Sequence, residues 1–250
     1  MGRFKKYFYL IGIFIVYVLF GACKNNADGG SGVTHTVGDI LLEDGSWILQ
    51  MDVANMTTET LNNKRAVGVY AYEENGKPHC VGLAISDMKL KWAKENTIGY
   101  KTRIDALVGT ESSGVKDGSG SLTVIKNLGD YTQDNYPAFY WAEQFNANDV
   151  LYKGKPTKGE GGGWYIPSIY ELKKIYNGRI AINASLQKLN TINNTVCKIT
   201  SLGNNVYWSS SQVSKDNYDY DVYEIDFNFY SPDITANKDL QQYVLVVHVF

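Results

Sequence analysis

Histidine and cysteine are scarce in this chain, with three of each in 250 residues. The histidines, His35, His79 and His248, lie far apart in the sequence. The chain also lacks the motifs Gly-x-Ser-x-Gly, Gly-x-x-x-x-Gly-Lys, His-Glu-x-x-His and Cys-x-x-Cys. These absences argue against a histidine-based catalytic triad, a nucleotide-binding loop and a zinc site. We therefore expect no catalytic residues and no enzyme activity.

An excess of positive charge is also missing. Lysine and arginine total 24 against 26 acidic residues, which gives a net charge of -2. Such a chain has no basic field to attract nucleic acid, so nucleic acid is not expected as a partner. The glycine run at 159–163 is followed by Trp164-Tyr165-Ile166-Pro167 rather than by a lysine and a helix, so it is a poor phosphate loop.

The N-terminus has the pattern of an export signal. Arg3, Lys5 and Lys6 precede an apolar run at 7–20, which is short for a membrane span and typical of a signal peptide. The run ends in Leu19-Phe20-Gly21-Ala22-Cys23, which resembles the lipobox of bacterial lipoproteins with its leucine one position early. This resemblance implies a signal peptide at 1–22 and a lipid on Cys23. An ordinary secretory signal with an incidental cysteine is the alternative.

The rest of the chain divides into a tether and one domain. Residues 23–37 are rich in Asn, Asp, Gly and Ser, which predicts a flexible tether. Residues 38–250 are enough for a substantial core, and we expect a single domain. Two cysteines remain in it, Cys80 and Cys197, and the sequence leaves open whether they form a disulfide or are two buried thiols.

Strand patterns begin the domain. Residues 38–48 read as a strand, an Asp-Gly turn and a second strand. Residues 66–72 predict another strand, which turns at Glu73-Glu74-Asn75-Gly76 and returns at 80–86. Residues 96–134 are polar and rich in Gly, Ser, Thr and Asp, so we expect long loops with one short helix.

Helices are predicted in the middle of the domain. Pro137 suits the first turn of a helix at 137–145, which carries an apolar stripe. Ser168 and Glu171 have the spacing of a capping box, and Pro167 fixes the entry to the helix. We expect this helix to run to Tyr176 and to end at Asn177-Gly178, with a further helix at 179–189.

The C-terminal part returns to strands. A short strand is expected at 207–211, and residues 223–229 alternate between apolar side chains and an outward row of Glu224, Asp226 and Asn228. Residues 243–250 are almost continuously apolar, as in a strand covered on both faces. Strands at both ends with helices between them predict an α+β fold in which the terminal strands pair in one antiparallel sheet.

Aromatic residues supply the candidate ligand site. The chain has 19 tyrosines, and tyrosine and tryptophan suit both sugar stacking and protein contacts. The alternative is that the tryptophans are core residues and that the serines satisfy turn backbone. The candidate ligand-binding residues are Trp164, Tyr165, Tyr207, Trp208, Ser209, Ser210 and Ser211.

Acidic residues near the C-terminus are weak candidates for a Ca²⁺ site, because carboxylate and backbone oxygens bind this ion. The alternative is the solvated face of an edge strand. We expect no cofactor, and Ca²⁺ is the one candidate left open. The residues concerned are Asp219, Asp221, Asp226 and Asp233, with Glu224 between them.

Two motifs resemble a known family. The sequence GGGWYIPSIYELKKI, followed by VYWSSSQ, is similar to the DUF1566 (Lcl C-terminal-like) domains of exported Bacteroides-type proteins, and the likeness covers residues 38–250. Ile166 replaces the usual leucine of the first motif, and Leu245 stands where relatives often have arginine. The resemblance implies a C-type-lectin-like fold with paired terminal strands, two or three flanking helices and a loop-rich half that presents ligands.

The function expected from this resemblance is binding in attachment. The chain would be a lipid-anchored protein of the outer membrane or cell surface that recognises a glycan or a protein. The alternative is a structural or accessory subunit of a surface appendage or outer-membrane complex. A third reading is an enzyme of the formylglycine-generating type, which uses reactive cysteines, but Cys80 and Cys197 have different sequence contexts.

Overall fold

The computed structural model describes residues 34–61, 64–86, 88–110, 113–147, 163–192, 202–213, 219–229 and 231–250. The expected signal peptide, Cys23 and Cys197 lie outside these residues. One compact unit spans His35–Phe250. The last residues of the expected tether therefore belong to the folded part: His35 and Thr36 hydrogen-bond to the carboxylate of Asp39.

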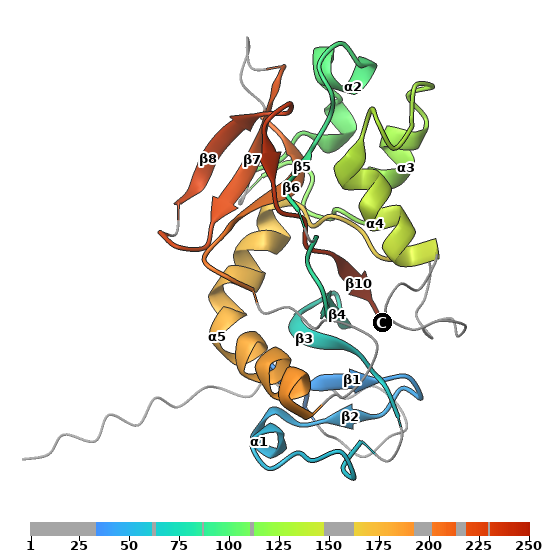
Figure 1. Ribbon diagram of the computed structural model, residues 1–250. Coiled ribbons are helices and arrows are strands. Elements are labelled where there is room, and N and C mark those ends of the chain that lie inside the picture. Colours follow the sequence, from blue (N-terminus) through green and yellow to red (C-terminus); the bar gives the residue numbers. More distant parts are fainter. Residues whose placement is uncertain are drawn as a thin grey trace, which may run out of the picture. The chain divides into compact units, whose positions relative to one another are not determined.

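The larger sheet has five antiparallel strands in the order β10-β4-β3-β1-β2 (Figure 1). The two terminal strands, β1 and β10, share this sheet but do not pair with each other as predicted. Strands β3 and β4 lie between them. The strands are β1 (Ile40–Leu42), β2 (Trp47–Ile48), β3 (Ala66–Glu74), β4 (Lys77–Gly82) and β10 (Val247–Val249).

The predicted hairpins of this sheet are confirmed. Strands β1 and β2 pair across the Asp-Gly turn. Strands β3 and β4 are joined by Asn75 and Gly76, which both have positive φ, at 52° and 73°. This is the geometry of a two-residue turn that matches the twist of the flanking strands.

Two smaller sheets contain the remaining strands. One has the order β6-β7-β8 and the other pairs β5 with β9. The expected outer row on β7 is confirmed only in part: Asn228 is exposed and Asp226 is half-buried, but Glu224 is buried. Phe229, expected on the apolar face, lies beyond the strand and is exposed. The strands are β5 (Leu90–Lys91), β6 (Val206–Gln212), β7 (Asp221–Asp226), β8 (Ser231–Asn237) and β9 (Gln241–Gln242).

Helices cover both faces of the larger sheet, and the fold is α+β. The predicted α4 is confirmed, and the loop region expected at 96–134 contains two short α-helices and one 3-10 helix. The helices are α1 (Gln50–Val53), α2 (Ile98–Lys101), η1 (Asp105–Leu107), α3 (Ser121–Lys126), α4 (Pro137–Ala147) and α5 (Ile169–Ile192). None of the helices in the described ranges is long and apolar enough to cross a membrane.

Helix α5 is continuous where two helices were predicted. It runs through Asn177 and Gly178 without ending. A Cβ atom on Gly178 would lie 2.7 Å from Cγ1 of Val37 and 3.7 Å from the carbonyl oxygen of Ala71. The glycine therefore lets the helix pass close to the chain at Val37, and it is a packing residue rather than a helix end.

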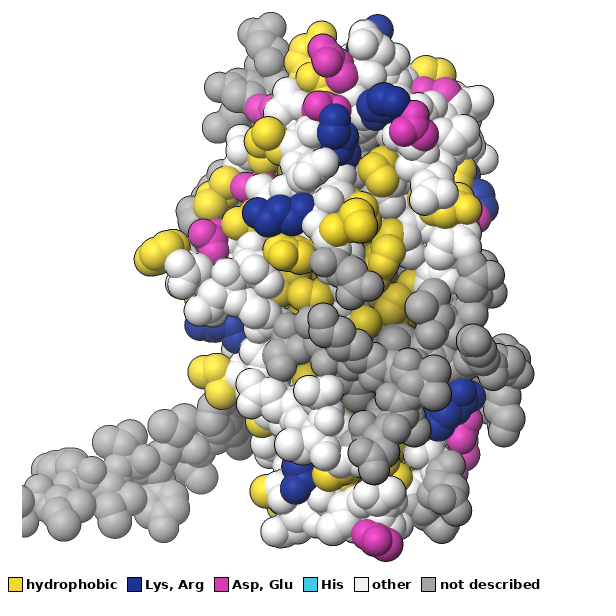
Figure 2. All heavy atoms as spheres, viewed as in Figure 1, with side chains coloured by type: hydrophobic (Ala, Val, Ile, Leu, Met, Phe, Trp, Pro, Cys, Tyr) yellow, Lys and Arg dark blue, Asp and Glu magenta, His cyan; other side chains and the backbone are white. Residues whose placement is uncertain are grey.

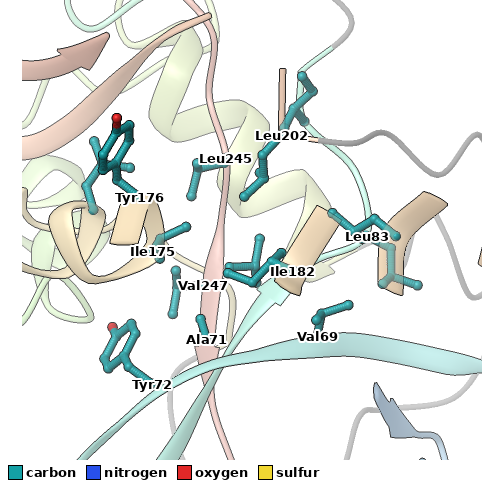
Figure 3. Packing of buried hydrophobic residues seen from close by; sticks show 14 of the residues in the cluster. Val69, Ala71, Tyr72, Leu83, Ile175, Tyr176, Ile182, Leu202, Leu245 and Val247 are labelled. Atoms are coloured by element: carbon teal, nitrogen blue, oxygen red, sulfur yellow. The ribbon is translucent and has the colours of Figure 1, made fainter. Parts of the chain in front are cut away.

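The core has a layer on each side of the larger sheet. One layer joins the sheet to α5, and Figure 3 shows Ile175 and Ile182 of the helix among Ala71, Leu245 and Val247. The other layer joins the opposite face to α4 through Phe139 and neighbouring apolar side chains. Residues 244–247 alternate between the two layers and are fully buried, which confirms the predicted burial on both faces. The predicted strand at 243–250 is wrong in its extent: only Val247–Val249 form β10, which is the last strand of its sheet.

Candidate functional site

All seven predicted ligand-binding residues are buried. Trp164 is 5% exposed, Tyr165 2%, and the five residues from Tyr207 to Ser211 at most 2%. The ring of Trp164 packs above Gly82, where a Cβ atom would lie 3.2 Å from the indole. These side chains present no ring face for sugar stacking, because strand and helix packing encloses them.

The two sequence motifs interlock in the interior. The backbone N–H of Ser210 donates to the carbonyl oxygen of Pro167 at 2.8 Å. The hydroxyl of Ser211 accepts from the backbone N–H of Ile169 at 3.0 Å, which satisfies a free donor at the start of α5. Strand β6 is thereby fixed to the entry of α5, and the motif pair is architecture.

Glu171 completes this junction. Its Oε2 accepts from the backbone N–H of Ser168 at 2.8 Å and the hydroxyl of Ser168 accepts from the N–H of Glu171 at 3.2 Å, which confirms the capping box. Oε2 also accepts from the Gly118 N–H, and Oε1 accepts from the hydroxyls of Tyr72 and Tyr165. Burial raises the pKa of Glu171 to about 7, against the hydrogen bonds from Ser168, Tyr165 and Gly118, which lower it.

The second motif, VYWSSSQ in β6, also holds strand β5 in place. The indole N–H of Trp208 donates to the carbonyl oxygen of Leu90 at 2.6 Å. The indole N–H of Trp92 donates to the carbonyl oxygen of Ser209 at 3.0 Å. These two bonds tie β5 to β6, so residues predicted to touch a ligand hold the strand next to an open groove.

That groove is the candidate functional site. It has a volume of about 470 Å³ and lies beside β5, β9 and the start of α4. Figure 2 shows apolar, basic and acidic side chains interleaved in the upper part of the view, where Figure 1 places β5 to β8 and α2 to α4. The groove is lined by Met88, Lys89, Leu90, Lys91, Lys94, Gln133, Asp134, Pro137 and Gln241.

Three lysines give the groove its charge. Lys91 pairs with Asp239 at 2.7 Å and Lys94 with Asp134 at 2.6 Å. The ammonium of Lys89 lies 5.8 Å from the ring centre of Tyr243 and has no ion pair with the described residues. Lys89 is therefore the lining lysine with no ion pair among the described residues, although its charge also acts on Glu224, and it lies beside the exposed side chain of Met88.

Sequence reasoning missed these residues. The segment 88–94 interleaves three lysines with apolar residues, and this pattern was a usable signal. Gln133, Asp134 and Gln241 come from other parts of the chain and carry no motif. Only the fold brings them to the same place.

The acidic candidates whose side chains the structure describes do not assemble a metal site. Among the residues that the structure describes, no three carboxylate, imidazole or thiol groups come together. Burial lowers the pKa of the Lys238 ammonium to about 7, and the nearby carboxylates of Asp219 and Asp221 act against this shift. Asp226 is half-buried at the end of β7, and the side chain of Asp233 lies outside the described part.

Cys80 is a free and fully buried thiol. Burial raises its pKa well above the ordinary value, which keeps it in the unreactive protonated form. His248 is buried beside it on β10, and burial lowers the pKa of this histidine to about 4. Both groups belong to the core, and neither faces the groove.

Comparison with known proteins adds no relative. No protein-family profile, no curated protein and no solved structure matches this chain.

Proposed function

We propose that this chain is a non-enzymatic, lipid-anchored surface protein that binds a glycan or a protein through the groove beside β5 and β9. The observation that carries the proposal is the groove itself, an open volume of about 470 Å³ with ammonium and amide groups on its walls. Ligand sites typically combine such a concave surface with a few polar groups that fix orientation.

The chemistry of the walls suits a hydroxyl-rich or carboxylate-bearing ligand. Gln133 and Gln241 offer amide donors and acceptors, and Lys89 offers an ammonium. The side chains of Met88 and Leu240 are 67% and 53% exposed and provide apolar contact nearby. A shallow mixed site of this size binds weakly, and many anchored copies on one surface would add avidity.

The C-type-lectin-like class is part of the proposal. It is supported by strands from both ends of the domain in one sheet, by α4 and α5 on opposite faces, and by short helices and loops between Thr97 and Tyr136. The groove lies where that loop region meets β5 and β9. In this class the loop-rich half presents ligands.

The lipid anchor on Cys23 has its own test. Cells grown with a labelled fatty acid should incorporate the label into the wild-type chain and not into Cys23→Ser. Label in the Cys23→Ser protein, or none in the wild type, would remove the anchor from the proposal.

A glycan array and a pull-down of surface proteins test the binding function. The protein used is the chain from Lys24 to Phe250, which contains every described residue. Its ligands should be lost with Lys89→Ala/Gln241→Ala and kept with Lys77→Ala/Gln187→Ala, a matched pair of exposed residues away from the groove. Binding to neither kind of target would favour a structural subunit instead.

A further inference from the structure

A buried lysine lies at the centre of the loop region. Lys238 follows β8, and its side chain is 0% exposed. Lysine is almost never fully buried unless its ammonium is paired. Here the ammonium donates to four backbone carbonyl oxygens: Gly99 at 2.8 Å, Tyr100 at 3.3 Å, Thr102 at 3.2 Å, and Asp219.

These carbonyls form a cage around a positive charge. The ring centre of Trp92 lies 5.4 Å from the ammonium, close enough for a cation–π contact. An ammonium has three N–H donors, whereas a neutral amine has two and would turn its lone pair towards an oxygen. Four oxygens around one nitrogen therefore favour the charged form, and the carboxylates of Asp219 and Asp221 act in the same direction.

We propose that this cage is a cation-binding site whose resident cation is the ammonium of Lys238, and that it accepts a free primary ammonium ion when the side chain is shortened. Backbone carbonyl oxygens are ligands that bind cations elsewhere in proteins. The proposal also explains why the predicted Ca²⁺ ligands Asp219 and Asp221 lie beside a lysine.

The cage connects the loops to the groove. It joins α2 to the residues before β7, and the next residue, Asp239, pairs with Lys91 in the groove wall. The backbone of Lys238 is fixed as well, since its carbonyl accepts from Ala93 and its N–H donates to Tyr220. A covalently attached cation would thus hold this wall without any metal.

Chemical rescue tests the proposal without a ligand. Lys238→Ala removes three methylene groups and the ammonium, which propylammonium chloride can replace. Thermal unfolding of the chain from Lys24 to Phe250 is measured at about pH 6, since burial lowers the pKa of Lys238 to about 7. The unfolding midpoint should fall by roughly 6–15 °C, as expected when carbonyls and carboxylates lose a buried cation.

Propylammonium should restore at least half of the lost unfolding midpoint, and the recovery should saturate as its concentration rises. The midpoint of the wild type should not change. Potassium chloride at equal ionic strength and 1-propanol are the controls for salt and for volume. Recovery equal to that given by either control, or no recovery in a folded variant, would overturn the proposal.

If Lys238→Ala does not fold, Lys238→Met tests whether the cage needs a cation. Methionine fills much of the same volume without a charge, and it cannot satisfy the four carbonyls. Its midpoint should be clearly lower than that of the wild type. A methionine variant as stable as the wild type would show that the cage needs no cation.

Discussion

The hydroxyl of Tyr165 lies 2.9 Å from Oε1 of Glu171 and donates a hydrogen bond to it inside the core. The hydroxyl of Tyr72 reaches the same oxygen at 3.0 Å. Glu171, at the start of α5, thereby joins Tyr72 of β3 to Tyr165, whose backbone forms a β-bridge with Val247 of β10. One carboxylate fixes the corner on which the first sequence motif lies.

We predict that Glu171→Ala lowers the free energy of unfolding by about 2–4 kcal/mol, because it leaves buried donors without an acceptor. Urea unfolding measures the change, with Glu73→Ala on the exposed hairpin as the control. Equal effects of the two substitutions would contradict the role of Glu171 at the junction.

Gly178→Ala should destabilise the fold by about 1–3 kcal/mol, although alanine favours a helix by about 1 kcal/mol over glycine. The new methyl group would overlap Cγ1 of Val37. Val37→Ala should therefore reduce the cost of Gly178→Ala in a double-mutant cycle. A stabilising Gly178→Ala substitution would mean that the helix does not pass this close to Val37.

Stability should depend on pH through Glu224. Oε2 of this buried residue has no partner among the described residues, and burial raises the pKa of Glu224 from 4.5 to about 7. The folded state then holds a proton that the unfolded state releases near pH 4.5. The free energy of unfolding therefore falls as pH rises from about 4.5 to about 7.

Glu224→Gln removes this titration. The variant should exceed the wild type by on the order of 1–3 kcal/mol above pH 7 and match it near pH 4.5. Urea unfolding across this pH range measures the difference, with Glu73→Gln as the exposed control. A difference that is constant with pH would contradict the raised pKa.

Trp208→Phe should loosen strand β5, because it removes the donor that holds the carbonyl oxygen of Leu90. We expect a loss of about 1–3 kcal/mol in the free energy of unfolding. Backbone hydrogen exchange should become faster at residues 89–92. The control is Trp141→Phe on the half-buried face of α4, and equal exchange in both variants would contradict the supporting role of Trp208.

Local signals in the sequence predicted local structure. The capping box of Ser168 and Glu171, the turn at Asn75 and Gly76 and the helix from Pro137 all depend on neighbours within a few residues. These elements are confirmed. The continuity of α5 was missed because the glycine signal for a helix end is local, while the contact that requires Gly178 comes from Val37 in a distant segment.

The site was harder to predict for the same reason. The burial of Trp208 depends on β5, α4 and β6 meeting in space, which no single motif encodes. The groove combines residues from β5, β9 and the loop before α4. The cage around Lys238 is made of backbone carbonyls, which have no side-chain signature in a sequence.

The most direct test is a comparison of ligand binding by wild type, Lys89→Ala/Gln241→Ala and Lys77→Ala/Gln187→Ala, on a glycan array and on isolated surface proteins, with Ca²⁺ and with EDTA. We expect a ligand that the wild type binds equally in both buffers, that the groove pair binds at least tenfold more weakly, and that the control pair binds as the wild type does. Undiminished binding by the groove pair would place the ligand face elsewhere and contradict binding through the groove beside β5 and β9.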